Sequence, residues 1–126
     1  MAFKWPKSIQ VGVRDIKIKY CNRKQFTAIH KKDDPDERLL ARALFYKDEI
    51  HICTEEPISW RIGTRDIPRN RRDILCSLLH EVVHFIDNEY NCDLDGEPEV
   101  NVWANEITKF MRSCNISLPA VREDEK

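Results

Sequence analysis

The chain has 126 residues, of which 41% are hydrophobic and 34% carry a charge. The 21 basic side chains nearly balance the 22 acidic ones, so no positive field favours nucleic acid as a partner and no acidic excess indicates a solvating tail. This length fits one compact domain and excludes two separate cores. We therefore expect a single domain over residues 1–126, with a frayed tail over residues 120–126.

The chain starts with MAFKWPKSIQ, which lacks the apolar segment of a signal peptide, and no apolar run approaches the ~18 residues needed to span a bilayer. Its five cysteines are an odd number without a Cys-x-x-Cys pair, which argues against a disulfide framework and against a thiolate zinc ribbon. These features predict a cytoplasmic protein with reduced thiols and no membrane partner.

Alternating apolar residues over 11–20 predict a first strand, with a bulge near Arg14 where the alternation breaks. A polar stretch, KKDDPDE, follows further along the chain and separates this strand from the next element. In it, Asp34 suits a helix N-cap and Pro35 suits the first helical position. We therefore expect a short helix that leads into ERLLARAL, residues 37–44.

Two β-type segments, residues 43–46 and 49–54, are separated by a short polar turn and predict a tight hairpin. Asn70 is a predicted N-cap, and an amphipathic pattern predicts a helix over residues 70–90. After a turn-rich break, a last helix is expected over residues 98–113. The predicted class is α+β, with a small, mostly antiparallel sheet packed on the first of these two long helices.

The predicted helix of residues 70–90 contains HEVVH, residues 80–84. On a helical wheel, His80 and His84 lie opposite the apolar side, as would also be true of a polar stripe that only faces water. Residues four apart lie one turn above each other, so both imidazoles can bind one tetrahedral zinc ion. Glu81 borders the same face, where it can reach a water as a general base. We therefore favour a Zn2+ site over a solvated stripe.

A catalytic zinc ion usually has three protein ligands, and HEVVH supplies only two. No histidine follows at a spacing that would complete the site, so an acidic residue further along the chain must serve. The candidates are Asp87, Glu89, Asp93, Asp95, Glu97, Glu99 and Glu106.

The motif HEVVH, a turn and then EPEVNVWA, residues 97–104, resemble the gluzincin metallopeptidases, and more narrowly the small ImmA/IrrE-type and phage-encoded zincins. In those zincins the next helix reads Glu-x-x-Ala-Asn/Asp-x-Phe-Ala, and its glutamate completes the zinc site. The resemblance covers residues 43–113 and implies a minimal zincin-like domain with Glu97 as the third zinc ligand, ahead of Glu99, which remains the alternative. Pro98 departs from the pattern, because it directly follows the expected ligand and disfavours helical geometry there.

The resemblance implies a zinc-dependent metallopeptidase that hydrolyses peptide bonds, with Glu81 as general base and a narrow intracellular protein substrate. An extended substrate is expected to pair with the edge of the strand of residues 49–54. Asn101 is a candidate hydrogen-bond partner of a histidine ligand, with a position facing water as the alternative. Two functional alternatives are a non-catalytic, zinc-stabilised protein-binding module and a hydrolase of a non-peptide amide such as a deformylase, whose upstream glycine-cysteine-leucine motif this chain lacks. The glutamate of the motif argues against that module, because a structural site needs no base.

Three side chains are candidates for stabilising the oxyanion of the transition state: Tyr46, His51 and Tyr90. His30 and His51 are otherwise expected at the surface rather than as metal ligands. The last helix is expected to bury one apolar face, comprising Val100, Trp103, Ile107, Phe110, Met111 and Cys114.

Overall fold

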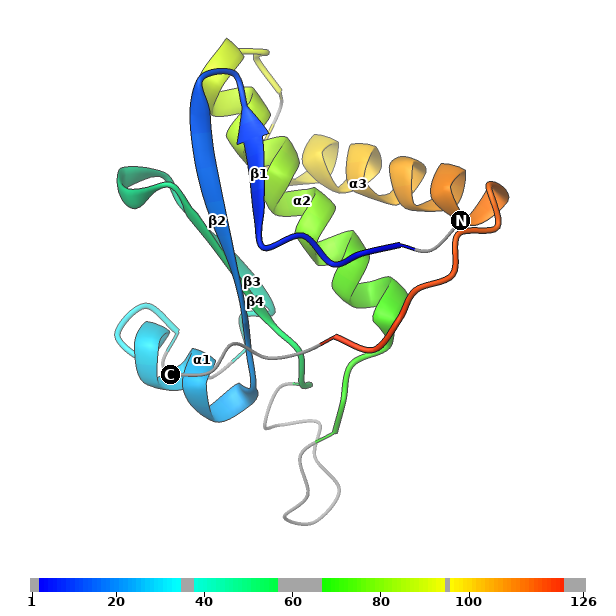
Figure 1. The fold of residues 1–126 in the computed structure, drawn as a ribbon. Helices are drawn as coiled ribbons and strands as arrows, with labels where there is room; N and C mark the ends of the chain where they lie inside the picture. The colour runs from blue at the N-terminus through cyan, green and yellow to red at the C-terminus, as the bar shows by residue number, and fades with distance from the viewer. Residues whose placement is uncertain (1–2, 35–37, 57–66, 95, 122–126) are drawn as a thin grey trace.

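The computed structural model describes residues 3–34, 38–56, 67–94 and 96–121. It is a small α+β fold with one four-stranded mixed sheet and three helices (Figure 1). No helix in these ranges is long and apolar enough to cross a membrane. The elements are β1 (Ser8–Val11), β2 (Arg14–Cys21), α1 (Arg23–His30), β3 (Ala41–Leu44), β4 (Glu49–Cys53), α2 (Arg71–Tyr90) and α3 (Gly96–Ser113).

The four strands lie in the order β1-β2-β4-β3. The β1–β2 and β3–β4 pairs are antiparallel, and β2 and β4 are parallel. The expectation of a mostly antiparallel sheet is therefore correct for two of the three pairs. Because β4 has a neighbour on each side, the expectation that a substrate adds to the edge of residues 49–54 is wrong, and the free edge on that side of the sheet belongs to β3.

The two faces of the sheet carry different side chains, as alternation along β4 predicts. Ile50 and Ile52 belong to the main core with residues of α2, whereas Cys53 packs with Phe26 of α1 on the other face. Helix α2 therefore covers one face and the short α1 covers part of the other. Helix α3 packs on α2, on the side away from the strands (Figure 1).

The predicted first strand is in fact a hairpin. Val11 pairs with Arg14, so the chain reverses at Gly12 and Val13 instead of continuing through a bulge. Gly12 has a φ of +59°, and a Cβ atom built there would lie 2.9 Å from Oε2 of Glu89. The positive φ favours glycine at this turn, whereas the flexible Glu89 side chain could shift to accommodate a Cβ atom.

The predicted helix leading into residues 37–44 is wrong where the structure describes it, because residues 41–44 form β3. Asp34 does accept hydrogen bonds from the backbone N–H groups of Arg38 and Leu39, but the chain then pairs with β4. This pairing outweighs the helical propensity of the segment. Residues 35–37 lie outside the described residues.

The two long helices lie close to their predicted positions. Asn70 caps α2 by accepting a hydrogen bond from the backbone N–H of Arg72. Helix α3 starts at Gly96, two residues earlier than predicted, and Pro98 is tolerated because the N–H groups of a first turn have no helical partner. The predicted buried face of α3 is only partly correct: Val100 is buried, whereas Trp103 is 53% exposed and Phe110 is 68% exposed. Of the predicted tail, residues 122–126 lie outside the described residues.

Candidate metal centre

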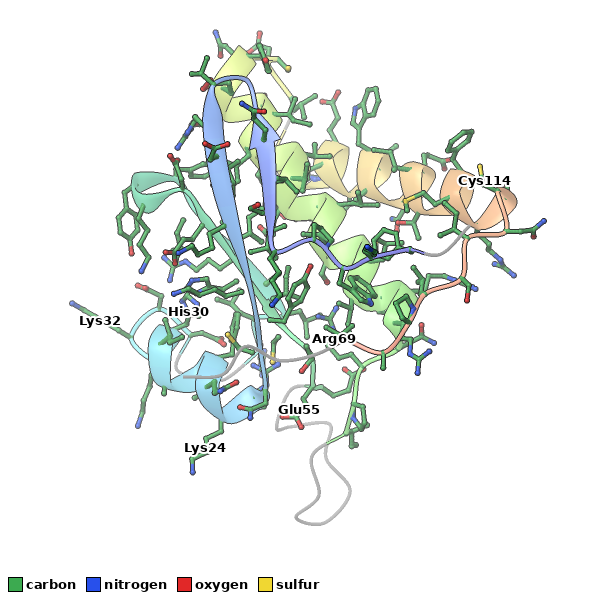
Figure 2. The ribbon with its side chains drawn as sticks, in the orientation of Figure 1. Lys24, His30, Lys32, Glu55, Arg69 and Cys114 are labelled. Carbon is green, nitrogen blue, oxygen red and sulfur yellow. The ribbon has the colours of Figure 1, made fainter. Side chains whose placement is uncertain are left out.

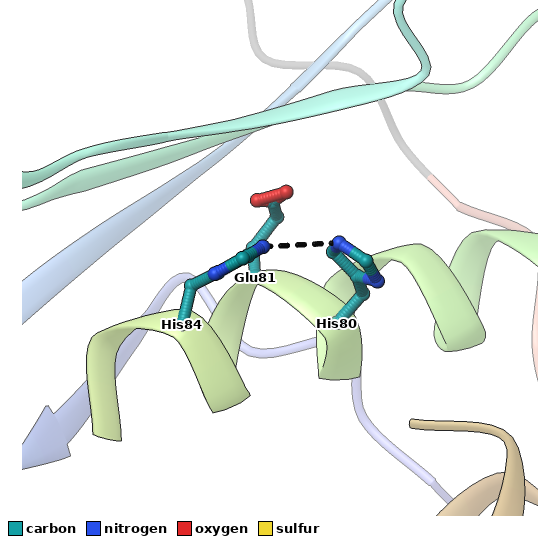
Figure 3. Close-up of side chains that lie close together, drawn as sticks. All are labelled: His80, Glu81 and His84. Carbon is teal, nitrogen blue, oxygen red and sulfur yellow. Dashed lines mark hydrogen bonds between the residues drawn. The ribbon is translucent and has the colours of Figure 1, made fainter. Parts of the chain in front are cut away.

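The motif of residues 80–84 lies in the middle of α2, where the helical repeat places its two histidines one turn apart. The Nε2 atoms of His80 and His84 are 3.1 Å apart. Their side chains are 17% and 23% exposed, so both rings reach solvent from a partly covered position. Figure 3 shows the rings close together, while Glu81 projects from the helix toward the strands.

Glu97, in the first turn of α3, meets both histidines. Its carboxylate oxygens lie 2.9 Å from Nε2 of His80 and 2.6 Å from Nε2 of His84. Glu99 does not line the groove around these side chains. The fold therefore brings Glu97, the preferred candidate from the sequence, to the histidine pair, and places Glu99 elsewhere on the same turn.

The donor set formed by His80, His84 and Glu97 fits a small cation that prefers nitrogen and oxygen. Ligand bonds of 2.0 to 2.1 Å in a tetrahedron place neighbouring donor atoms roughly 3.3 Å apart. The three separations of 2.6, 2.9 and 3.1 Å are shorter than this by roughly 0.2 to 0.7 Å, so the donors must move apart by that much around an ion. The Glu97 side chain is 65% exposed, so it can make this adjustment freely. Without an ion, the two Glu97 contacts are hydrogen bonds between imidazole and carboxylate, and the third is a contact between the two imidazoles.

Glu81 was expected at the border of the polar face of α2, but it is buried, with 7% of its surface exposed. Its carboxylate accepts a hydrogen bond from the backbone N–H of Ala43 in β3. Burial, helped by the charge of Glu97, raises the pKa of Glu81 to about 7, against the opposing effect of Ala43. A cation near the histidines would lower this pKa. The Glu81 carboxylate also lies within 4.8 Å of the histidine ring nitrogens, close enough to share a water with an ion there.

These side chains open into a groove of about 620 Å³ between β3 and the two long helices. One wall is β3, whose outer edge has no strand partner within the described sheet. The residues of this wall with small side chains, Ala41 and Ala43, leave room beside the strand. Arg38, which the sequence did not single out, lines the groove at the start of that wall, and Phe45 lines it at the end.

Asn101 lines the same groove, one helical turn after Glu97. Within the described part of the chain, Asn101 makes no hydrogen bond to either histidine, so no contact supports its predicted role as their hydrogen-bond partner. Asp87 accepts a hydrogen bond from the backbone N–H of Leu94 and thus braces the turn after α2.

The three candidates for oxyanion stabilisation are not beside the histidines. Tyr46 is 81% exposed and Tyr90 is 61% exposed, and neither lines the groove. His51 is buried on the opposite face of the sheet. These expectations are wrong because the hairpin turn and the end of α2 direct both tyrosines away from the groove.

His30 and His51 form a buried pair, which corrects the expectation that they lie at the surface. They are 3% and 1% exposed, and Nε2 of His30 lies 2.8 Å from Nδ1 of His51. Nε2 of His51 lies 2.8 Å from the Glu49 carboxylate. Figure 2 shows His30 at the end of α1, next to the sheet. In the sequence, only the position of His51 between two isoleucines of β4 indicated that it could be buried. Helix α1, which covers that face of the sheet, was not predicted.

The candidate centre therefore combines three converging donors, a buried carboxylate and an open groove beside a strand edge. Such a set can hold a divalent cation, accept a proton and accommodate an extended chain. Comparisons with models of protein families, with curated proteins and with solved structures found no match to this chain. The resemblance to the gluzincins therefore stays an expectation from the sequence of residues 43–113.

Proposed function

We propose that this protein is a zinc-dependent metallopeptidase with a minimal zincin-like fold. His80, His84 and Glu97 are the metal ligands, and Glu81 is the general base. The observation that carries the proposal is the approach of Glu97 from a second helix to within 2.6 to 2.9 Å of both histidine Nε2 atoms. A stripe of solvated polar residues on α2 would not require a third donor from α3.

When bound, zinc supplies a Lewis acid that acidifies a water molecule and polarises a peptide carbonyl. Glu81 takes the proton from the attacking water and returns it to the leaving amine. The Ala43 N–H holds the Glu81 carboxylate between α2 and β3, where it faces any chain that lies along the groove. The contact thus fixes the base relative to both the ligands and the strand edge.

An extended peptide is proposed to bind along the outer edge of β3. Backbone N–H and C=O groups on the outer edge of a strand can form hydrogen bonds to a peptide irrespective of its sequence. On β3 the Ala43 N–H is held by Glu81, so the peptide would pair with the remaining groups of this edge. The groove between this edge and the two long helices places that peptide over His80 and His84. A narrow intracellular protein substrate, and a cytoplasmic location, remain part of the proposal on the strength of the resemblance.

The test is metal content followed by hydrolysis. The untagged protein, dialysed to remove loosely bound ions, should retain about one zinc per chain by elemental mass spectrometry. The zinc form should cleave members of a quenched fluorescent peptide library. The Glu81→Gln variant should keep the zinc and lose the cleavage. A folded protein that retains no zinc would refute the metal site, whereas retained zinc without cleavage of any peptide or protein substrate would favour the non-catalytic binding module.

A further inference from the structure

An apolar groove lies on the flank of α2 away from the candidate metal centre. Its volume is about 490 Å³, and it runs between α2, the N-terminal segment and the last turns of α3. None of the described residues that line it is charged. The main apolar contributors are Phe3, Ile9, Leu79, Val82, Ile86 and Met111.

An apolar ridge on α3 borders this groove. Trp103, Ile107 and Met111 follow one another at intervals of four residues, so they lie in one row along the helix. Met111 ends the row inside the groove. Phe110 lies beside the same row, and it is 68% exposed while Trp103 is 53% exposed. The ridge and the groove therefore form one continuous surface, convex on α3 and concave beside α2.

The exposed apolar area is large for a chain of this size. Trp103, Phe110, Tyr90 and Ile86 are 53%, 68%, 61% and 38% exposed. With their usual side-chain areas, these four residues alone expose roughly 450 Å². A standard stable interface buries about 800 Å² on each partner, most of it apolar at the centre. These four side chains, together with the groove lining, supply the central part of such an interface.

We propose that a second copy of this chain covers the surface, with the α3 ridge of each copy seated in the groove of the other. A two-fold interface must be self-complementary, and a ridge beside a groove on one surface meets that requirement. The uncharged groove offers no cationic group that would select an acidic partner or an anionic membrane. Glu97 and Asn101 line the metal groove on the other flank of α3, so the dimer leaves that groove open.

The test is the oligomeric state of the full chain by sedimentation equilibrium, from low micromolar to several hundred micromolar protein. A reducing agent is required, because Cys92 and Cys114 are exposed and could link copies by disulfides. We expect a reversible dimer whose dissociation constant rises at least about 100-fold in the double variant Trp103→Glu, Phe110→Glu. Met111→Arg, in the groove, should weaken the dimer independently.

The matched control is Val102→Glu. Val102 is 60% exposed on the same helix, one residue before Trp103 and about 100° around the helix from it. This variant should dimerise like the wild type, and circular dichroism should show that all variants are folded. A wild-type protein that stays monomeric over the whole range would overturn the proposal. If that monomer also sediments with phosphatidylcholine vesicles, a lipid surface and not a second copy covers the apolar surface. A dimer unaffected by the ridge and groove variants would overturn it as well.

Discussion

The buried histidine pair predicts that the protein loses stability in mild acid. Burial, together with the charges of His51, Arg42 and Lys47, lowers the pKa of His30 from 6.5 to about 4 in the folded protein, against the weaker opposing effect of Asp33. Between these two pH values the unfolded chain binds the proton and the folded chain does not. The contribution to folding stability is therefore complete above pH 6.5 and is lost as the pH falls toward 4.

The magnitude follows from the size of the shift. A change from 6.5 to about 4 corresponds to about 3 kcal/mol over the whole window, and to about 2 to 3 kcal/mol by pH 4.5. The charged groups around the pair are Glu49, Lys19 and Lys47 on the sheet side, and Arg42 with its ion-pair partner Asp33. Of these groups, Asp33 favours the charged form of His30, and burial together with the neighbouring positive charges outweighs it.

The assay is urea unfolding of the metal-free protein at pH 7.5 and pH 4.5, followed by circular dichroism. The wild type is compared with His30→Gln, whose amide can still donate to Nδ1 of His51 but cannot bind a proton. We expect the wild type to lose about 2 to 3 kcal/mol more than the variant between the two pH values. Removing metal ions keeps any contribution of the proposed zinc site at His80 and His84 out of the comparison. Equal losses in both proteins would refute the assignment of the acid sensitivity to His30.

Three further predictions test the centre and the hairpin. Glu97→Gln should weaken zinc binding about 100-fold or more in a competition titration with a chelator, whereas Glu99→Gln should not; equal effects would refute the assignment of Glu97 as ligand. Ala43→Pro removes the N–H that binds Glu81 at an edge strand that tolerates proline, so peptide cleavage should fall at least about 10-fold with zinc retained. Gly12→Ala should lower the free energy of unfolding by about 1 to 2 kcal/mol in urea, and an unchanged value would mean that the turn relaxes.

Local signals in the sequence identified the long helices well. The Asn70 cap and the periodic apolar residues place α2 over almost the predicted range, and alternation predicts which residues of β4 face the core. These features depend on neighbours a few residues apart, which a sequence shows directly. The same is true of the two histidines, whose separation is set by the helical repeat alone.

Helix α1 shows how a local signal can be missed. Asn22 and Gln25 form a reciprocal capping box, which the spacing Asn-x-x-Gln could have indicated. The helix has eight residues, and its buried positions are Arg23, Phe26 and His30, of which only one is apolar. The apolar residues therefore do not mark the buried face of α1: Ile29 is 52% exposed, whereas Arg23 is buried and its guanidinium donates hydrogen bonds to backbone carbonyl groups of residues distant in sequence. Hydrogen bonds to residues distant in sequence produce no periodic pattern in the sequence of the helix.

The sequence predicted the hairpin of residues 43–46 with residues 49–54, but β3 begins two residues earlier, within the segment that was expected to follow a helix. Ala41 and Leu44 belong to a segment with good helical propensity, and only the antiparallel register with β4 makes it a strand. This pairing also decides the environment of the candidate base, because it delivers the Ala43 N–H to the carboxylate of Glu81. The sequence therefore predicts the identity of the base, and the non-local pairing determines how buried it is.

The burial of Glu81 favours the proposed metal site over a stripe of polar residues that only faces water. The residue is 7% exposed, and a carboxylate removed from water with one backbone hydrogen bond costs folding free energy. In a stripe that only faces water, nothing would offset this cost, whereas a cation between the histidines would. Glu81→Gln replaces the charge with a neutral amide of the same shape and should stabilise the metal-free protein by about 1 to 2 kcal/mol at pH 8, measured by urea unfolding.

The matched control for this stabilisation is Glu106→Gln, which neutralises an exposed carboxylate on α3 and should leave the stability nearly unchanged. Saturating zinc should reduce or reverse the gain in Glu81→Gln, because the wild-type charge then lies near a cation. A metal-free Glu81→Gln protein that is less stable than the wild type would mean that the carboxylate is a structural anchor for β3. The stability of the fold, and not the chemistry of a peptidase, would then account for its burial.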